Sequence, residues 1–313
     1  MKKIAPVVLF TYNRFEETQQ TVEALRRNYL AGQTRLFIFS DGAKDSISED
    51  KVKEVRLYLK TISGFKSVEI FESTCNRGLA NSIIYGVSKI IEIYETVIVL
   101  EDDLITTPNF LDFMNEGLRI FKDNSQVYAI NGYSLNIDVT DCYTHYFHVR
   151  AFPWGWATWK NNWNGVNFDK LIIKNQLDKN PEILKDFESF VGADSSEMLI
   201  SSINSKNNSW YIRWVFDNFL KNKVSVFPIS SKIINIGFSE DATHCDGISV
   251  YNSNPDKKYL RALNFDKELF LRAKDPRFLK YFSMRYKILY RAKLLFKSNG
   301  ASLVFKEIKN KFK

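Results

Sequence analysis

Residues 97–110 read VIVLEDDLITTPNF, an apolar run that passes directly into acidic residues. Residues 97–100 predict a buried strand, and Glu101, Asp102 and Asp103 follow it without a break. Like charges side by side are costly unless a cation binds them. Mg²⁺ and Mn²⁺ prefer oxygen ligands and often take substrate phosphates as well. The stretch predicts a metal that bridges protein and diphosphate or, alternatively, a solvated acidic turn that caps the next helix.

Strands alternate with helices around this stretch. The strands are expected within residues 5–14, 34–45, 66–74, 96–103 and 127–134. The helices are expected within 15–29, 48–62 (with Ser48 as cap), 77–94 and 108–123. Such alternation over residues 4–134 favours an α/β fold with a mostly parallel sheet flanked by helices. Ligands bind beyond the carboxyl ends of such strands, where four polar clusters fall. These clusters are Thr11–Arg14, Ser40–Asp41, Asn76–Arg77 and Glu101–Asp103.

Composition places the chain among folded proteins and removes several site types. Its 313 residues are 45% hydrophobic, enough for a sizeable core. Three widely spaced cysteines without a C-x-x-C pair argue against a zinc cluster or a disulfide framework and fit a reducing compartment. The short apolar stretch near the N-terminus contains Pro6 and is expected to be a strand rather than a signal peptide. No apolar run approaches the length of a membrane-spanning helix.

Positive charge is concentrated at the C-terminal end of the chain. The formal charge is +8, but residues 256–313 contain 17 Lys and Arg and five Asp and Glu, a net of +12, so the rest carries −4. Apolar and basic residues alternate there at helical spacing. A helix lying on an anionic membrane is expected, with truncation after about residue 280 releasing the protein; a solvated helix packed on the domain is the alternative. Nucleic acid is not an expected partner.

We therefore expect a catalytic unit over residues 1–255 and a basic helical segment over 256–313. The unit divides into a nucleotide-binding half, 1–134, and an acceptor half, 135–255. No Walker A sequence is present, and no G-x-G-x-x-G follows the first strand. Their absence argues against a P-loop ATPase and a dinucleotide-binding dehydrogenase.

Three motifs resemble those of a known family. VIVLEDDLITTPNFLDFM, residues 97–114, resembles the strand, Glu-Asp-Asp-Leu motif and following helix of the N-acetylglucosaminyltransferase I family. That family has the GT-A fold of nucleotide-sugar-dependent glycosyltransferases. LFTYNR (9–14) and IFSDGAKD (38–45) resemble its first- and second-strand motifs. The likeness spans about residues 4–245 and does not include the family's membrane anchor and stem. We therefore expect a bacterial relative that builds surface polysaccharide. It is expected in the cytoplasm, peripheral on the inner face of the cell membrane.

The resemblance implies roles for the residues of these motifs. Asp103 matches the ligand of the divalent metal, Mn²⁺ or Mg²⁺, and Glu101 and Asp102 match positions that meet the sugar and ribose. Asp41 matches the residue that contacts the nucleobase, although an Asp-Gly turn is the alternative. Arg14 matches an arginine at the nucleotide pocket, although a lone arginine can equally be a surface residue.

Neighbouring polar residues join this predicted nucleotide-sugar site. Thr11 and Asn13 precede Arg14 in the first motif. Asn76 and Arg77 follow the third strand, where the family also contacts the nucleotide, with a looser local match. Arginine pairs with diphosphate in a forked geometry, but Arg77 can also cap a helix.

The second half of the chain contains the predicted base. RWVFDNFLKN, residues 213–222, resembles the family segment that contains this base, and Asp217 is its only carboxylate. The base removes a proton from the acceptor hydroxyl. The alternative is that Asp217 pairs with Arg213, four residues earlier on one helix face. Glu240 and Asp241 are further candidates for the base.

Two more predictions come from the second half. His244 is the second-to-last residue of the polar segment NIGFSEDATHC and is expected at the metal or the diphosphate, with a structural histidine as the alternative. The segment FPWGWATW, residues 152–159, resembles the acceptor side of the family. Trp154 and Trp156 are therefore expected to stack on an acceptor sugar, with core packing as the alternative.

Together with the acidic motif, the family resemblance implies an inverting, metal-dependent glycosyltransferase. Its expected donor is a UDP-sugar, with UDP-N-acetylglucosamine as one candidate, and its acceptor is a saccharide that a lipid could carry. Two other classes stay open. A sugar-phosphate nucleotidyltransferase shares the sheet and the metal carboxylates, although the glycine-rich loop it wants after the first strand is missing. A non-catalytic polysaccharide- or membrane-binding protein would leave the carboxylates unexplained.

Overall fold

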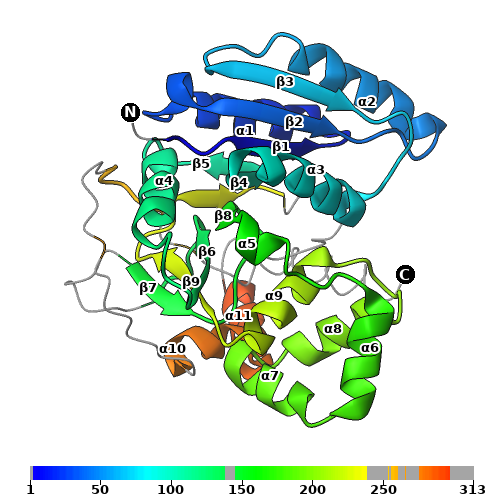
Figure 1. Cartoon of the computed structure of the whole chain (residues 1–313), viewed down its shortest axis with the longest axis vertical. Helices are drawn as coiled ribbons and strands as arrows, with labels where there is room; N and C mark the ends of the chain where they lie inside the picture. The colour runs from blue at the N-terminus through cyan, green and yellow to red at the C-terminus, as the bar shows by residue number, and fades with distance from the viewer. Residues whose placement is uncertain are drawn as a thin grey trace.

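The computed structural model describes residues 3–137, 145–237, 253, 255–259, 265 and 275–296. Its first part contains β1 (Val7–Thr11), α1 (Phe15–Arg26), a 3-10 turn (Ala31–Gln33), β2 (Arg35–Ser40), α2 (Ser46–Leu59), β3 (Ser67–Glu72), α3 (Leu79–Tyr94), β4 (Thr96–Glu101), β5 (Leu104–Thr106), α4 (Phe110–Ile120) and β6 (Val127–Asn131) (Figure 1).

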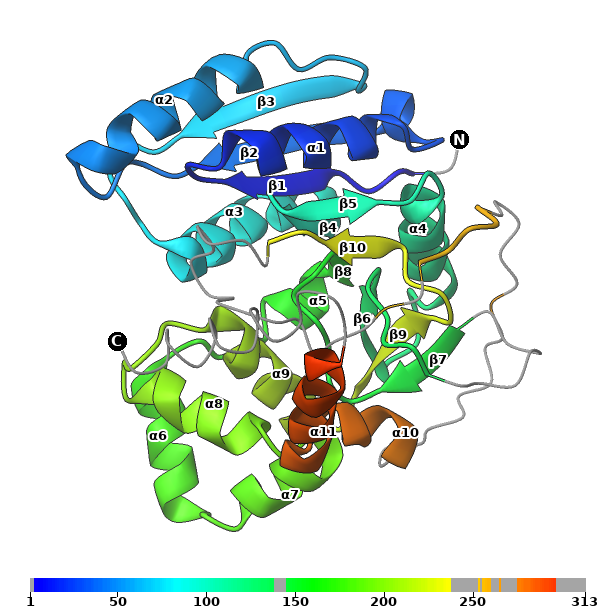
Figure 2. The ribbon, with the colours of Figure 1, turned by 180° about the vertical axis from the view of Figure 1, so that it is seen from behind.

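The second part contains β7 (His145–His148), β8 (Trp156–Trp159), α5 (Lys160–Trp163), α6 (Lys170–Lys179), α7 (Ile183–Val191), α8 (Ser195–Ile203), α9 (Trp210–Leu220), β9 (Val224–Pro228) and β10 (Ile233–Asn235). Close to the C-terminus lie α10 (Pro276–Leu279), a 3-10 turn (Lys280–Phe282) and α11 (Met284–Leu295) (Figure 2). Between residues 183 and 203 the chain forms two helices rather than one, because it turns at Gly192 with φ +131°.

The central sheet has the strand order β3-β2-β1-β4-β8-β6-β9-β7. The first four of these strands run parallel, β8 is antiparallel to both β4 and β6, β9 is parallel to β6, and β7 is antiparallel to β9. A second, small sheet pairs β5 with β10. The predicted fold class, an α/β fold with a mostly parallel sheet flanked by helices, is confirmed.

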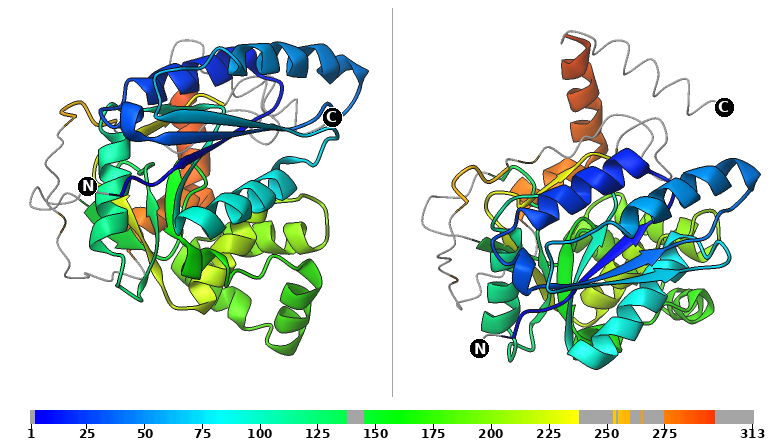
Figure 3. Two further views of the ribbon diagram at one scale, coloured as in Figure 1. Left: turned by 45° about the horizontal axis from the view of Figure 1, so that its top comes forward. Right: turned by 90° about the horizontal axis from the view of Figure 1, so that it is seen from above.

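Helices cover both faces of this sheet. Helices α1 and α2 lie over one face and α3 over the other (Figure 3). Continuous apolar strands such as β1, whose five residues are all buried, fit this arrangement because both faces are covered. Helix α2 buries Val52, Val55 and Leu59, as its spacing predicts. Its N-cap is Asp45 rather than Ser48, which lies three residues later and completes a capping box.

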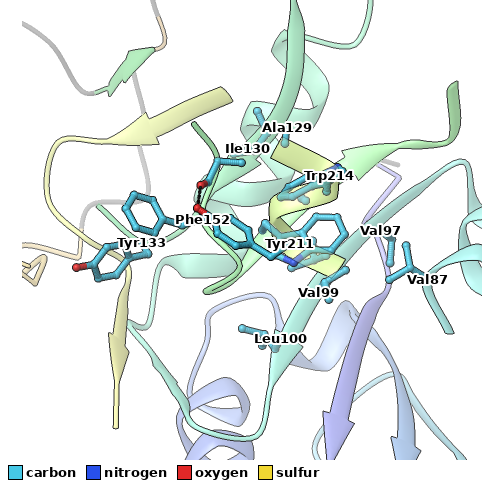
Figure 4. Close-up of a cluster of buried hydrophobic side chains, with 14 of the residues drawn as sticks. Val87, Val97, Val99, Leu100, Ala129, Ile130, Tyr133, Phe152, Tyr211 and Trp214 are labelled. Carbon is cyan, nitrogen blue, oxygen red and sulfur yellow. Dashed lines mark hydrogen bonds between the residues drawn. The ribbon is translucent and has the colours of Figure 1, made fainter. Parts of the chain in front are cut away.

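The core is continuous from the first half into the second. Val97, Val99 and Leu100 of β4 gather with residues of β6, α3 and α9 (Figure 4). Trp214 of α9 and Tyr128 of β6 are fully buried within it. The two expected halves are therefore joined by shared packing.

The segment close to the C-terminus packs on the second half of the chain. Phe278 and Phe282 are buried, and the ring of Phe278 stacks on His148 with the centroids 3.6 Å apart. The Arg150 guanidinium lies 3.8 Å from the centroid of the Phe282 ring. Phe282 also contacts the turn at Gly192, where an added Cβ would lie 2.8 Å from it. Residues around 278–282 thus belong to the core.

His148 should make the stability of the protein depend on pH. Burial, reinforced by the charge of Arg150, lowers the pKa of His148 to about 3, although Asp275 opposes this. In the unfolded state this histidine binds a proton near pH 6.5. Its contribution to the free energy of unfolding is therefore fully present above that pH and is lost as the pH drops. We expect His148 to lower the free energy of unfolding by about 2–3 kcal/mol when the pH falls from 7 to 4.5. Urea titrations of the wild type and His148→Gln would test this, because the variant should lose less on acidification. Equal losses in both proteins would contradict it.

Candidate active site

Four strands deliver polar groups to one edge of the sheet, as predicted. Strands β3, β2, β1 and β4 are parallel neighbours, so the residues that follow them share this edge. They are residues 11–14 after β1, Asp41 after β2, residues 73–78 after β3 and the carboxylates after β4. Open α/β sheets bind their ligands at this edge.

Arg14 compensates the charge of the carboxylates. It is the N-cap of α1, and its side chain donates to Asp102 and, at 3.0 Å, to Asp103 Oδ2. The backbone N–H of Tyr12 donates to Asp102 Oδ2 at 3.3 Å. Because the guanidinium bridges the two aspartates, the chain can place them side by side. Arg14 therefore lies within the acidic cluster rather than free at the surface.

One arginine does not fully balance three carboxylates. Burial raises the pKa of Asp102 to about 6, and the charge of Asp103 adds to this while Arg14 opposes it. Burial also raises the pKa of Glu101 well above its usual value, with further contributions from Asp103 and Asp102. A second cation at this edge would relieve the remaining repulsion.

Asp103 presents an oxygen that no group of the described chain engages. It is buried, and its Oδ1 has no hydrogen-bond partner there. Its backbone carbonyl accepts from the N–H of Ile236 at 2.9 Å. Gly237 comes so close that an added Cβ would lie 1.9 Å from Asp103 Oδ2. The pairing of β5 with β10 brings Gly237 to this position, since β10 ends two residues before it.

Thr21 fixes the backbone around the carboxylates. From α1, its hydroxyl donates to the carbonyl of Asp102 at 2.9 Å and accepts from the N–H of Leu104 at 3.0 Å. Thr21 is fully buried. Sequence reasoning missed Thr21 and the contact of Gly237 with Asp103, because each residue lies far along the chain from the motif that it supports.

The donor set suits a metal that also binds substrate. Among the residues that the structure describes, no group of three or more His, Cys, Asp and Glu could hold an ion. Mg²⁺ and Mn²⁺ commonly use one or two carboxylates together with substrate phosphates and water. The unengaged Oδ1 of Asp103 fits this mode of binding. His244, the other predicted ligand, lies outside the described residues.

Asp41 ties two loops together. Its Oδ1 accepts from the backbone N–H groups of Gly42 and Arg77, and its Oδ2 accepts from that of Gly78, each at 2.9 Å. Asn76 donates from its side chain to the carbonyl of Gly42 at 2.8 Å. Asp41 and Asn76 thus fix the loop after β3 against the end of β2. A carboxylate has about four acceptor positions, so Asp41 keeps capacity for a ligand.

A cavity of about 320 Å³ lies beside this loop. Asp41, Arg77 and Tyr85 contribute to its lining. The guanidinium of Arg77 lies 4.4 Å from the centroid of the Tyr85 ring, and its Nε donates to Ser73 Oγ at 3.2 Å. The cavity combines aromatic, cationic and acidic groups at the predicted nucleotide side. Among the described residues, a larger cavity of about 1310 Å³ opens near the start of β4, and no predicted site residue lines it.

Arg56 of α2 supports the same corner and has no sequence signal. It donates to the carbonyls of Asp41 and Ser73, at 3.1 and 2.7 Å, and pairs with Glu72 at 3.6 Å. These bonds join the ends of β2 and β3.

Thr11 is buried at the end of β1, and its hydroxyl has no hydrogen-bond partner in the described chain. Asn13 is half-buried beside it.

The two predicted acceptor tryptophans have different surroundings. Trp156 is 0% exposed and packs among Trp163, Trp210 and Trp214, which leaves it no surface for a sugar. It is a core residue, as the alternative interpretation had it. Trp154 is half-buried, with its ring edge-on to that of Tyr133 at 4.7 Å. It lies two residues before Trp156, which pairs with Val99, and therefore near the carboxylate edge.

The predicted base Asp217 lies at the opposite end of the sheet. Its Oδ2 accepts from the Tyr128 hydroxyl at 2.6 Å and pairs with Lys221 at 2.7 Å. Strand β8 pairs with both β6 and β4, and this pairing sets Ala129 of β6 at the same height as Val97 of β4. Tyr128, one residue earlier, therefore lies level with the start of β4. From the level of Tyr128 to Glu101 is a distance of five residues along β4, which corresponds to about 16 Å at the rise per residue of a β-strand. The structure does not bring Asp217 to the carboxylates, and its ion pair is with Lys221, not Arg213.

Replacing Asp217 with alanine should lower stability without removing activity. The buried Tyr128 hydroxyl would lose its acceptor, at a cost of about 1–3 kcal/mol. Because the site edge is untouched, turnover at a temperature where the variant is folded should stay within about threefold of wild type. Urea denaturation and a transfer assay on the same sample would measure both. Loss of turnover in a stably folded Asp217→Asn variant would restore Asp217 as the base.

No protein-family model and no curated protein matches the chain. Among solved structures, it is similar to a mannosyltransferase from Pyrobaculum calidifontis in complex with GDP-mannose and Mn²⁺, at 13% identity and a TM-score of 0.37, covering 50% of this chain. It is also similar to S. aureus TarS, at 12% identity and a TM-score of 0.31, covering 48% of this chain. The matches span 45% and 23% of the lengths of those two chains. The narrower resemblance to N-acetylglucosaminyltransferase I stays a prediction.

Proposed function

We propose that this protein is a metal-dependent glycosyltransferase that uses a nucleotide-sugar donor. The observation that supports this most directly is the buried, unengaged Oδ1 of Asp103 within an acidic cluster at the carboxyl edge of a parallel sheet. Such an edge is suited to a nucleoside diphosphate, because a metal can join its phosphates to the carboxylate.

The residues of the edge divide the work. Asp103 would hold Mn²⁺ or Mg²⁺, which supplies charge neutralisation for a departing nucleoside diphosphate. Arg14 lies within 3.0 Å of Asp103 and can turn its remaining N–H groups toward a phosphate. Glu101 and Asp102 are proposed to bind the hydroxyl groups of the sugar and ribose.

The nucleotide is proposed to lie over the ends of β1, β2 and β3. Thr11 and Asn13 would line the β1 side. Asp41 and Arg77 line the cavity on the other side, and Asn76 fixes the adjoining loop. The ring of Tyr85, which also lines this cavity, is proposed to stack on the nucleobase. A UDP-sugar is the proposed donor, and UDP-N-acetylglucosamine is the first candidate to test.

The acceptor is proposed to enter beside Trp154. Its hydroxyl attacks the anomeric carbon as the nucleoside diphosphate leaves, so a single displacement inverts that centre. Asp217 is too far away for the role of base, given its place near the start of β4. We assign the base to Glu240 or Asp241, which follow Gly237 by three and four residues; both lie outside the described residues, as does His244.

A bacterial surface polysaccharide is the proposed product, with a saccharide acceptor that a lipid could carry. In the described part of the chain, none of the helices combines the length and apolarity that crossing a bilayer requires. Peripheral binding at the inner face of the cell membrane is proposed as the place of action.

One assay separates the three classes of function. The purified protein is incubated with a panel of UDP- and GDP-sugars, with Mn²⁺ or with EDTA, and release of the nucleoside diphosphate is followed by mass spectrometry. A transferase should hydrolyse its donor slowly, and only with the metal. A nucleotidyltransferase should instead release pyrophosphate from a nucleoside triphosphate and a sugar phosphate. No turnover with any donor would support a binding protein and contradict our proposal.

A further inference from the structure

Helix α11 exposes several large apolar side chains to solvent. The exposed apolar side chains are Met284, Ile288, Leu289 and Leu295 of the helix and Phe296 directly after it, and Phe296 is 91% exposed. Their spacing of about four and seven residues places them on one face of a helix. A helix of a water-soluble protein normally has the opposite arrangement, with its apolar stripe against the core.

The other face of α11 attaches the helix to the protein. The ring of Tyr286 lies 4.8 Å from that of Tyr281, and the Lys287 ammonium lies 3.5 Å from Asp194 Oδ2. Asp194 also pairs with the buried Arg150 at 2.7 Å. Beyond this attachment the helix stands clear of the body of the molecule (Figure 3, right).

The exposed face is also basic. Arg285 and Lys293 are exposed among its apolar side chains, and residues 276–296 contain no Asp or Glu. We propose that this face, defined by Met284, Arg285, Ile288, Leu289, Lys293, Leu295 and Phe296, docks on an anionic membrane surface. Its apolar side chains enter the boundary of the acyl chains while the two cations meet lipid phosphates.

Charge favours a membrane over a second copy of the chain. Two copies joined through this face would bring Arg285 and Lys293 of each against those of the other, with no acid on the helix to pair with them. An anionic bilayer supplies the missing negative charge and an apolar interior together. Exposed apolar patches of this kind mark docking surfaces.

The attachment sets the orientation of the docked protein. Phe278 and Phe282 are buried directly before α11, and Lys287 is paired with Asp194, so the helix is held against the second half of the chain. That half contains Trp154, the proposed acceptor side. Truncation after residue 280 would remove buried Tyr281 and Phe282, so it would damage the fold as well as the membrane surface.

Vesicle flotation of the full chain tests the proposal without measuring activity, so its outcome does not depend on the proposed transferase function. The protein is mixed with vesicles of phosphatidylcholine alone or with phosphatidylglycerol added. We expect binding to the anionic vesicles that weakens with salt. Two double variants, Ile288→Gln with Phe296→Gln and Arg285→Gln with Lys293→Gln, should each lower the bound fraction at least about tenfold.

The matched control is Ile47→Gln with Lys53→Gln on α2, which removes an apolar side chain 82% exposed and an exposed cation far from this face. It should float like wild type, and all variants should keep the wild-type melting temperature. Binding that ignores lipid charge, or that survives both α11 variants, would overturn the proposal. So would a concentration-dependent dimer in solution that the same α11 substitutions abolish.

Discussion

Asp103→Asn is expected to lower metal-dependent sugar transfer by at least about a thousandfold. The amide keeps nearly the same shape, so the close contact with Gly237 is preserved. It removes the anionic oxygen that no other group of the described chain engages and with it the proposed metal ligand. Turnover of the donor would be measured across a Mn²⁺ titration, and Mn²⁺ binding would be followed separately by electron paramagnetic resonance.

The same substitution should leave stability equal to or above that of wild type in the absence of metal, although it removes the ion pair of Asp103 with Arg14. The charge of Asp103 raises the pKa of Glu101, so its loss relieves repulsion within the cluster, while Arg14 retains Asp102. A melting temperature equal to or above that of wild type, together with lost activity, would separate chemistry from folding. Asp50→Asn, an exposed acid on α2, is the control and should change neither. Full activity of Asp103→Asn would sink the proposed site.

The edge of the sheet could be predicted because local pattern decides it. Apolar runs that end in polar residues fix where each strand stops, and parallel pairing then brings those ends together. Asp103 and Arg14 were found this way, and their contact follows from neighbouring strands β1 and β4. The place of these residues at the edge needed only sequence order and the geometry of a doubly wound sheet. Their roles in the site rest on the family resemblance and stay predictions.

The site residues of the second half could not be predicted from the sequence, because the same local pattern of residues fits both a binding role and a packing role. Trp156 lies in a segment whose aromatic residues suit a sugar platform, yet the turn at Gly155 directs it into the core. Asp217 lies on a helix whose rotation is set by packing of Trp214, a tertiary contact that no local pattern reveals. Its ion pair forms with Lys221 rather than Arg213 for the same reason.

Contacts between distant segments were equally hidden. Thr21 is a threonine in a helix, and nothing around it signals that its hydroxyl serves Asp102 and Leu104. Gly237 belongs to a turn-like segment in sequence. Its closeness to Asp103 depends on the pairing of β10 with β5, which joins residues more than a hundred positions apart.

Gly237→Ala is expected to reduce turnover by about a hundredfold or more while the protein stays folded. A methyl group there would lie 1.9 Å from Asp103 Oδ2 and 2.7 Å from its carboxyl carbon, so one of the two segments must shift. The carboxylate is the end of a short side chain held by Arg14, and its movement would displace the proposed metal position. Kinetics at saturating donor, with increasing Mn²⁺, would show a weaker apparent metal affinity than that of wild type.

Gly32→Ala is the matched control, because an added Cβ there meets nothing within 4 Å. It repeats the same change of backbone and side chain away from the site, so it should retain wild-type kinetics. If Gly237→Ala also retained wild-type turnover and metal affinity, the carboxylate of Asp103 could move without consequence. Rigid placement of that group between Arg14 and Gly237 would then not be what the chemistry requires, and the metal would have to be bound elsewhere along the edge.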